Sequence, residues 1–95
     1  MFIGYEQVLA TNVVKAIAAF PNMPANATQV ELQADTQNVR YTMDGSAPTQ
    51  IRGMLFLTTE PPKLFLIEDF IRIRFVRGAA SDGFLSAHYS AGRDV

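Results

Sequence analysis

The chain alternates between apolar and polar positions in short runs that turn residues interrupt, a pattern typical of β-strands. From Gln29 to Ala34 every second residue is apolar, and the run from Asn38 to Met43 repeats this arrangement. Successive side chains of a strand project to opposite faces of the sheet, so this period of two predicts half-buried strands. Short alternating segments predict an all-β domain, either a sandwich or a barrel of about seven to eight mostly antiparallel strands.

Further segments continue the β pattern along the chain. We expect additional strands over Gln7–Leu9, Asn12–Ile17, Gly53–Thr58, Lys63–Ile67, Ile71–Phe75 and Phe84–Tyr89. Residues 13–19 also have helix-forming side chains, but their apolar positions leave no polar stripe, and strands are therefore favoured. The range 53–58 is apolar on both faces, which indicates either a central strand covered on both sides or a strand at a subunit contact.

The length of 95 residues is that of one domain. We expect a single β-sandwich domain over residues 1–95, with an N-terminal arm at about 1–6 and a loose tail at about 90–95. The arm contains Phe2, Ile3 and Tyr5, which would form an adhesive patch if they were exposed. They are expected to dock either on their own domain or on a neighbouring subunit.

The composition narrows the classes of function. Hydrophobic residues make up 48% of the chain and charged residues 18%, below the average of about 25% for soluble domains. The net charge is -1, whereas a nucleic-acid-binding protein usually has a basic excess. With no cysteine and one histidine, a thiolate zinc site and a two-histidine metal site within one chain are excluded, and no cofactor is expected. The low charge indicates assembly with other subunits.

The segment from Val39 to Thr49 is the most distinctive in the sequence. An alternating strand leads into Asp44-Gly45, a strong turn signal, and the side chains of Asp44 and Ser46 can bond nearby backbone N–H groups. Pro48 holds the following chain extended, and Thr49 can return a hydroxyl bond. A structural turn is therefore favoured over a calcium site at Asp44, because calcium needs six or more oxygens and no acidic cluster is near.

This segment resembles the Tyr-Thr-x-Asp-Gly-Ser-x-Pro-Thr signature of small β-sandwich modules of the chitobiase C-terminal type. It is also similar to a group of short tailed-bacteriophage virion proteins, in which an Arg-aromatic pair precedes the same turn and a glycine opens an apolar strand. Arg40-Tyr41 and Gly53-Met54-Leu55 match those positions. The second resemblance extends to Tyr5-Glu6-Gln7, to Phe70–Arg77 and to Leu85–Tyr89, and it implies a capsid decoration or cement protein without enzymatic activity.

Candidate contacts follow from the apolar runs and from one pair of arginines. Arg72 and Arg74 lie two residues apart, so on a strand they would share a face and could meet carboxylates of a neighbouring subunit; an ordinary solvated strand face is the alternative. The interface candidates are Phe2, Ile3, Tyr5, Met54, Phe56, Phe65, Arg72 and Arg74. Apolar residues at the N-terminus, in 53–58 and in 64–67 need a cover beyond one core, and another chain is the simplest cover.

Catalytic arrangements are poorly supported by the sequence. Glu68-Asp69 are adjacent carboxylates, which are expected to lie in a loop between strands rather than across a cleft. Ser86, His88 and Asp82 contain the residue types of a catalytic triad, but no nucleophile elbow or oxyanion loop accompanies them. We therefore expect a surface or interface histidine and a protein that is not an enzyme.

The sequence and its resemblance together predict a structural virion protein that binds a bacteriophage capsid through subunit contacts. The expected partners are the major capsid protein and further copies of the chain, with a trimer implied by the resemblance. No apolar run reaches about 18 residues and no signal peptide is evident, so we expect synthesis in the host cytoplasm and location on the capsid surface, with no contact to nucleic acid or membrane. A carbohydrate-associated β-sandwich module and a phage tail or neck component are the alternatives.

Overall fold

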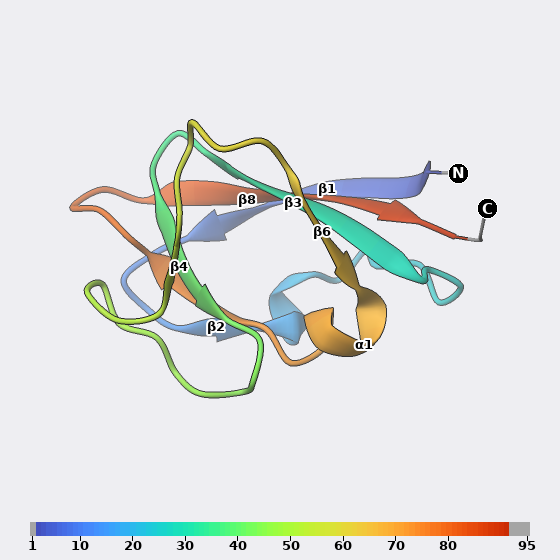
Figure 1. Cartoon of the computed structure of the whole chain (residues 1–95), viewed down its shortest axis with the longest axis horizontal. Coiled ribbons are helices and arrows are strands. Elements are labelled where there is room, and N and C mark those ends of the chain that lie inside the picture. Colours follow the sequence, from blue (N-terminus) through green and yellow to red (C-terminus); the bar gives the residue numbers. More distant parts are fainter. Residues whose placement is uncertain (1, 92–95) are drawn as a thin grey trace.

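The computed structural model describes residues 2–91, which form two antiparallel four-stranded sheets (Figure 1). Sheet A has the strand order β1-β8-β3-β6, and sheet B has the order β2-β7-β4-β5. The eight strands are β1 Phe2–Ala10, β2 Lys15–Ala16, β3 Gln29–Asp35, β4 Val39–Thr42, β5 Met54–Phe56, β6 Lys63–Leu66, β7 Arg74–Arg77 and β8 Gly83–Ser90. The expectation of an all-β sandwich of seven to eight strands is confirmed.

The core lies between the two sheets and follows the alternation of the sequence. In β3, Val30, Leu32 and Ala34 are buried while the residues between them face outward. In β4, Val39 and Tyr41 are buried in the same way. Strand β8, which lies between β1 and β3, contributes further buried side chains at every second position. Each sheet therefore has one face in the core and one outer face.

A short helical segment closes one end of the sandwich. Helix α1, Ile67–Phe70, is a single turn between β6 and β7, and the 3-10 turn η1, Ile17–Ala19, follows β2 (Figure 1). Phe70 is completely buried and packs edge-on against Phe20, with ring centroids 4.9 Å apart. Phe20 also contacts Phe75 of β7 at 5.4 Å. These rings fill the space at this end of the core.

A buried polar pair links β1 to β8. The Tyr89 hydroxyl donates a hydrogen bond of 2.5 Å to Oε2 of Glu6, and the Asn22 N–H donates to Oε1 at 3.4 Å. Tyr89 is fully buried and Glu6 nearly so. Burial raises the pKa of the Tyr89 phenol, and the hydrogen bond to Glu6 and its charge raise it further. The pair satisfies a carboxylate that would otherwise be costly to bury.

Several predicted strand boundaries are corrected by the structure. The strand expected over Ile71–Phe75 begins only at Arg74, because the chain first forms α1 and then a turn at Ile71. Glu68 and Asp69 lie within α1 rather than in a loop. The strands expected over 12–17 and 53–58 shorten to β2 and β5, and β5 is an edge strand of sheet B rather than a central one.

The structure also corrects the expected N-terminal arm at about 1–6 and the start of the expected tail at about 90. Residues 2–6 form the first part of β1 rather than a separate arm, and β8 extends to Ser90. Residue 1 and residues 92–95 lie outside the described part of the chain. Within residues 2–91 there is no helix that is long and apolar enough to cross a membrane.

Candidate functional site

The turn after β4 forms where the sequence predicts, with Asp44 bonding a backbone N–H as expected, whereas the Ser46 hydroxyl bonds the Asp44 carboxylate rather than a backbone N–H. Oδ1 of Asp44 accepts hydrogen bonds from the N–H of Ser46 at 3.0 Å and from its hydroxyl at 2.6 Å. These bonds to Ser46 lower the pKa of the Asp44 carboxyl, with Arg72 making a smaller contribution. Gly45 has a φ of 86°, a conformation that glycine adopts without strain. Pro48 is buried, and Thr49 exchanges backbone bonds with Arg52.

Gly53 explains why a glycine opens the next strand. Its φ is 116°, and a Cβ placed there would lie 2.9 Å from Cβ of Pro48 and 3.2 Å from the Tyr41 carbonyl oxygen. The backbone of the turn therefore passes too close for any side chain. The turn residues position β4 against β5, and a shallow hollow beside the turn is lined by Thr42, Met43, Asp44, Gly53 and Met54.

The predicted interface residues divide into exposed and buried groups. Phe2, Tyr5 and Met54 have 51%, 58% and 61% of their surface exposed. Ile3 is half-buried and packs against the core. Phe56 is completely buried in its own core, so this candidate was wrong, and the half-buried Phe65 packs edge-on against Tyr41.

In β6 the exposed apolar residues are not the predicted interface residue Phe65 but the two residues on either side of it. Leu64 is 59% exposed and Leu66 is 48% exposed, because Phe65 between them faces the core. In the loop before β5, Ile51 is 82% exposed, and Leu55 of β5 is partly exposed. The apolar runs named from the sequence thus do carry apolar side chains on the surface.

The outer face of sheet A combines these apolar residues with polar ones. Tyr5 of β1 lies opposite His88 of β8, His88 lies opposite Glu31 of β3, and Glu31 lies opposite Leu64 of β6. The four residues therefore form one row across the whole sheet. Phe2 stacks on His88 with ring centroids 3.7 Å apart. A hollow in this face is lined by Tyr5, Glu31, Gln33, Pro62, Ser86 and His88.

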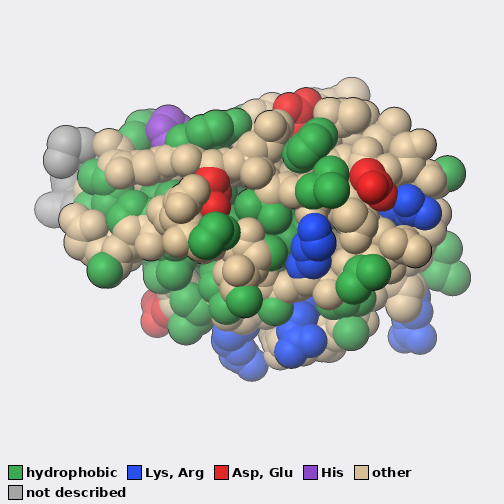
Figure 2. All heavy atoms as spheres, turned by 180° about the vertical axis from the view of Figure 1, so that it is seen from behind, with side chains coloured by type: hydrophobic (Ala, Val, Ile, Leu, Met, Phe, Trp, Pro, Cys, Tyr) green, Lys and Arg blue, Asp and Glu red, His purple; other side chains and the backbone are tan. Residues whose placement is uncertain are grey.

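Charge is distributed unequally between the two sheets. On the sheet B side the described residues include Arg40, Arg52, Arg72 and Arg74, with Asp44 as the acidic residue among them. Arg72 donates a hydrogen bond to the Asp44 carbonyl at 3.2 Å, and Arg74 is exposed in β7. The two arginines therefore do not act as a stacked pair on one strand face. Figure 2 shows most of the Lys and Arg side chains in its lower half, on the sheet B side.

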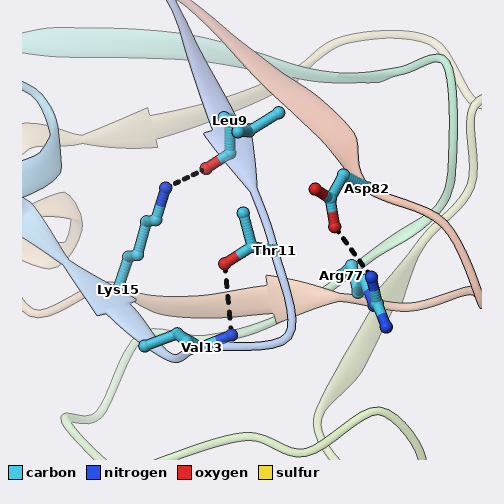
Figure 3. Close-up of polar contacts among 6 residues, drawn as sticks. All are labelled: Leu9, Thr11, Val13, Lys15, Arg77 and Asp82. Carbon is cyan, nitrogen blue, oxygen red and sulfur yellow. Dashed lines mark hydrogen bonds and ion pairs between the residues drawn. The ribbon is translucent and has the colours of Figure 1, made fainter.

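Near the end of β1, at the edge of sheet A, the Leu9 carbonyl is bonded by a side chain from β2, and the turn between the two strands is held by a hydrogen bond of its own. Lys15 Nζ donates to the Leu9 carbonyl at 2.8 Å, and the Val13 N–H bonds Oγ1 of Thr11 at 3.2 Å (Figure 3). Arg77 forms an ion pair of 2.8 Å with Asp82 at the same end of the molecule (Figure 3). A lysine at an edge discourages the addition of a further strand.

The residues that resemble catalytic types are engaged in other contacts. Asp82 pairs with Arg77, His88 stacks on Phe2, and the Ser86 hydroxyl accepts a hydrogen bond from Tyr5 at 3.3 Å. The three residues therefore form no triad. Among the described residues there is also no group of three or more His, Cys, Asp or Glu side chains that could hold a metal ion.

Comparison with protein-family models, with curated proteins and with solved structures finds no match for this chain.

Proposed function

We propose that this protein is a structural virion subunit that decorates and stabilises a bacteriophage capsid through contacts between subunits. The observation that carries the proposal is the placement of exposed apolar side chains on both sides of the sandwich. Phe2, Tyr5 and Leu64 lie on the sheet A side, while Met54 and Leu55 lie at the edge of sheet B. One copy can therefore contact two neighbours at once.

The stabilising effect would come from apolar burial. Covering an exposed Leu, Phe or Met side chain contributes about 1.5–3 kcal/mol, and a large exposed apolar patch is itself typical of an interaction surface. A shell that binds many copies gains this free energy at every site, so opening the shell costs correspondingly more. No bond is made or broken in this mechanism.

The partners under this proposal are the major capsid protein and other copies of the chain. The protein would be made in the host cytoplasm and would reside on the capsid surface. A trimer at the local three-fold positions of the shell remains the prediction that the resemblance gives. A tail or neck location would use the same kind of contact and would differ in the virion component to which the chain binds.

The carbohydrate-associated module is less well supported by the positions of the tyrosines. Such a module needs exposed aromatic rings in a row that can stack on sugars. Tyr41 and Tyr89 are buried in the core, which leaves Tyr5 as the exposed tyrosine. Phe2, the exposed aromatic nearest to it, is stacked on His88.

Binding to purified capsids tests the proposal. Shells stripped of the protein are incubated with the wild type, with Leu64→Ser/Leu66→Ser and with Met54→Ser/Leu55→Ser, and then sedimented. The wild type should bind with a fixed number of copies per shell and delay thermal opening of the shell, and at least one double variant should bind more weakly. A protein that binds polysaccharide and ignores the shells would contradict the proposal. Val13→Ser, which changes an exposed apolar residue in the turn between β1 and β2, is the matched control.

A further inference from the structure

We propose that the outer face of sheet A is a two-fold contact surface for a second copy of this chain, with β1 of each copy lying over β6 of the other. This inference rests on the self-association that the proposed function includes. It names the surface and assigns two-fold symmetry to it, in place of the three-fold symmetry that the resemblance implies. The proposed contact between two copies forms without any residue of the capsid shell.

The row across sheet A is chemically self-complementary. Read from β1 to β6, it contains an aromatic residue, a histidine, a carboxylate and an aliphatic residue, namely Tyr5, His88, Glu31 and Leu64. Consider a two-fold axis that is parallel to the strands, lies midway between the two facing sheets and passes over the gap between β8 and β3. Rotation by half a turn about this axis reverses the order of the row. Tyr5 then faces Leu64 of the second copy, and His88 faces Glu31 of the second copy.

The neighbouring positions agree with the same operation. Phe2 lies at one end of β1 and Leu66 lies at the corresponding end of β6, since Phe2 and Gln29 both pair with Ser90 and Gln29 pairs with Leu66. The rotation brings these two exposed apolar residues together. Ser86 and Gln33, which are opposite each other on β8 and β3, also exchange places. The contact therefore has apolar borders and a polar centre with hydrogen-bonding groups on both sides.

Charge disfavours the corresponding contact between two sheet B faces. That side includes Arg40, Arg52, Arg72 and Arg74, with Asp44 as the carboxylate among them, so two copies would repel each other. The outer face of sheet A carries Glu31 and Asp35 and none of the described Lys or Arg residues. Each Glu31 there has a histidine of the second copy as its partner.

Stacking sheet A on sheet B would match the charges but would not close. The two outer faces point in opposite directions, so a repeated contact of that kind produces an open stack, whereas the two-fold contact ends at two copies. Edge-to-edge pairing through β1 is opposed by Lys15, which already occupies the Leu9 carbonyl (Figure 3). The face of sheet A is thus the surface on which a closed pair can form.

The size of the face sets the expected strength. The strands of sheet A have nine, eight, seven and four residues. At about 3.3 Å per residue and about 4.8 Å between strands they present a face of about 450 Å² per copy. Two such faces give about 900 Å² in total, which is below the range of about 1,200–2,000 Å² for stable interfaces and typical of weak, transient contacts. We therefore expect a reversible dimer whose population rises with protein concentration.

Cross-linking between single-cysteine variants tests the geometry, because no cysteine occurs in the wild type. Tyr5→Cys and Leu64→Cys are prepared separately, mixed and treated with a short bis-maleimide. The mixture should give a cross-linked dimer in at least about tenfold higher yield than either variant alone, since the rotation pairs position 5 with position 64. Equal yields from the mixture and the separate variants would overturn the proposed symmetry.

Charge exchange tests the centre of the contact. Glu31→Lys places a cation opposite His88 and should weaken dimerisation at pH 7 by about tenfold or more, and the further change His88→Glu should restore it. Arg74→Glu on the other sheet is the matched control and should leave the dimer unchanged. Light scattering over a concentration series gives the dissociation constants, and circular dichroism confirms that each variant is folded.

These measurements separate this inference from the proposed function. A wild type that stays monomeric up to millimolar concentration, a trimer unaffected by Glu31→Lys, or an open polymer sensitive to Arg74→Glu would overturn the two-fold contact. Each result leaves the sedimentation assay with capsids free to succeed. Conversely, a dimer with the expected cross-link that does not bind shells would contradict only the virion proposal.

Discussion

At the scale of single residues, the structure depends on a few positions where chemistry and backbone are tightly constrained. Glu6 and Tyr89 come from opposite ends of the sequence, yet they form one buried hydrogen bond between adjacent strands. Gly53 allows a backbone approach that no other residue permits. The Asp-Gly turn was predictable from local sequence signals, whereas the Glu6–Tyr89 pair was not, because period-two alternation does not say which distant strands become neighbours.

Replacing Tyr89 with phenylalanine should destabilise the fold while preserving its shape. The change removes the donor to a buried carboxylate, and such a bond is worth about 1.5–3 kcal/mol. Urea unfolding at pH 7 measures the loss, and Glu6→Gln and the double variant complete a thermodynamic cycle. Single-variant effects that simply add would show that the two side chains do not interact.

The same tyrosine should make stability sensitive to alkaline pH. Its pKa is raised in the folded protein, so its contribution is fully present below the ordinary value of 10.0 and is lost as the pH rises above it, because the unfolded chain then releases the proton first. Unfolding free energies measured from pH 8 to 11 should fall more steeply for the wild type than for Tyr89→Phe. Parallel curves for the two proteins would be inconsistent with this pairing.

Two glycines with positive φ provide a matched comparison. In Gly45→Ala the added Cβ has no atom within 4 Å, so the unfolding free energy should fall only by the strain of the left-handed backbone, about 1 kcal/mol. Gly53→Ala adds a contact with Pro48 and with the Tyr41 carbonyl, so its loss of unfolding free energy should be clearly larger. Thermal or urea unfolding of both variants measures the difference, and a smaller loss at Gly53 would refute the close approach.

At the scale of elements, alternation predicted two central strands well but misplaced the strand expected over Ile71–Phe75, which begins only at Arg74. Residues 29–34 and 38–43 became β3 and β4 with the expected faces buried. Where both faces were apolar, the sequence could not decide which residues point inward, so Phe56 and Phe65 were chosen as contacts although Leu64 and Leu66 are the more exposed. Helix α1 was missed because a single turn has little intrinsic stability and forms here through the packing of Phe70.

This account of α1 predicts contrasting effects at two adjacent residues. Phe70→Ala should reduce the unfolding free energy by about 3–5 kcal/mol, because the ring fills the end of the core. Ile71→Ala, at an exposed position, should change it by about 0.5 kcal/mol or less. Denaturant unfolding of the two variants provides the measurement, and similar losses would show that α1 does not close the core.

At the scale of the whole molecule, the few charged residues are unevenly distributed between the outer sides of the two sheets. Sheet A presents apolar borders around a polar centre, and Arg40, Arg52, Arg72 and Arg74 lie on the sheet B side, where Figure 2 shows Lys and Arg side chains gathered in its lower half. A small sandwich has one core, so its outer apolar residues are available for other chains. Which surface meets the shell and which meets another copy depends on partners outside this chain, so the sequence alone could not assign it.

The central claim is that this chain is a building component of a virion shell, and cryo-electron microscopy of the particle whose genome encodes it tests that claim most directly. We predict density for the eight-stranded sandwich at regular positions on the outside of the capsid, with Leu64 or Met54 buried against a neighbouring chain. Purified particles that lack the chain, or that hold it without contact to the shell, would contradict the account.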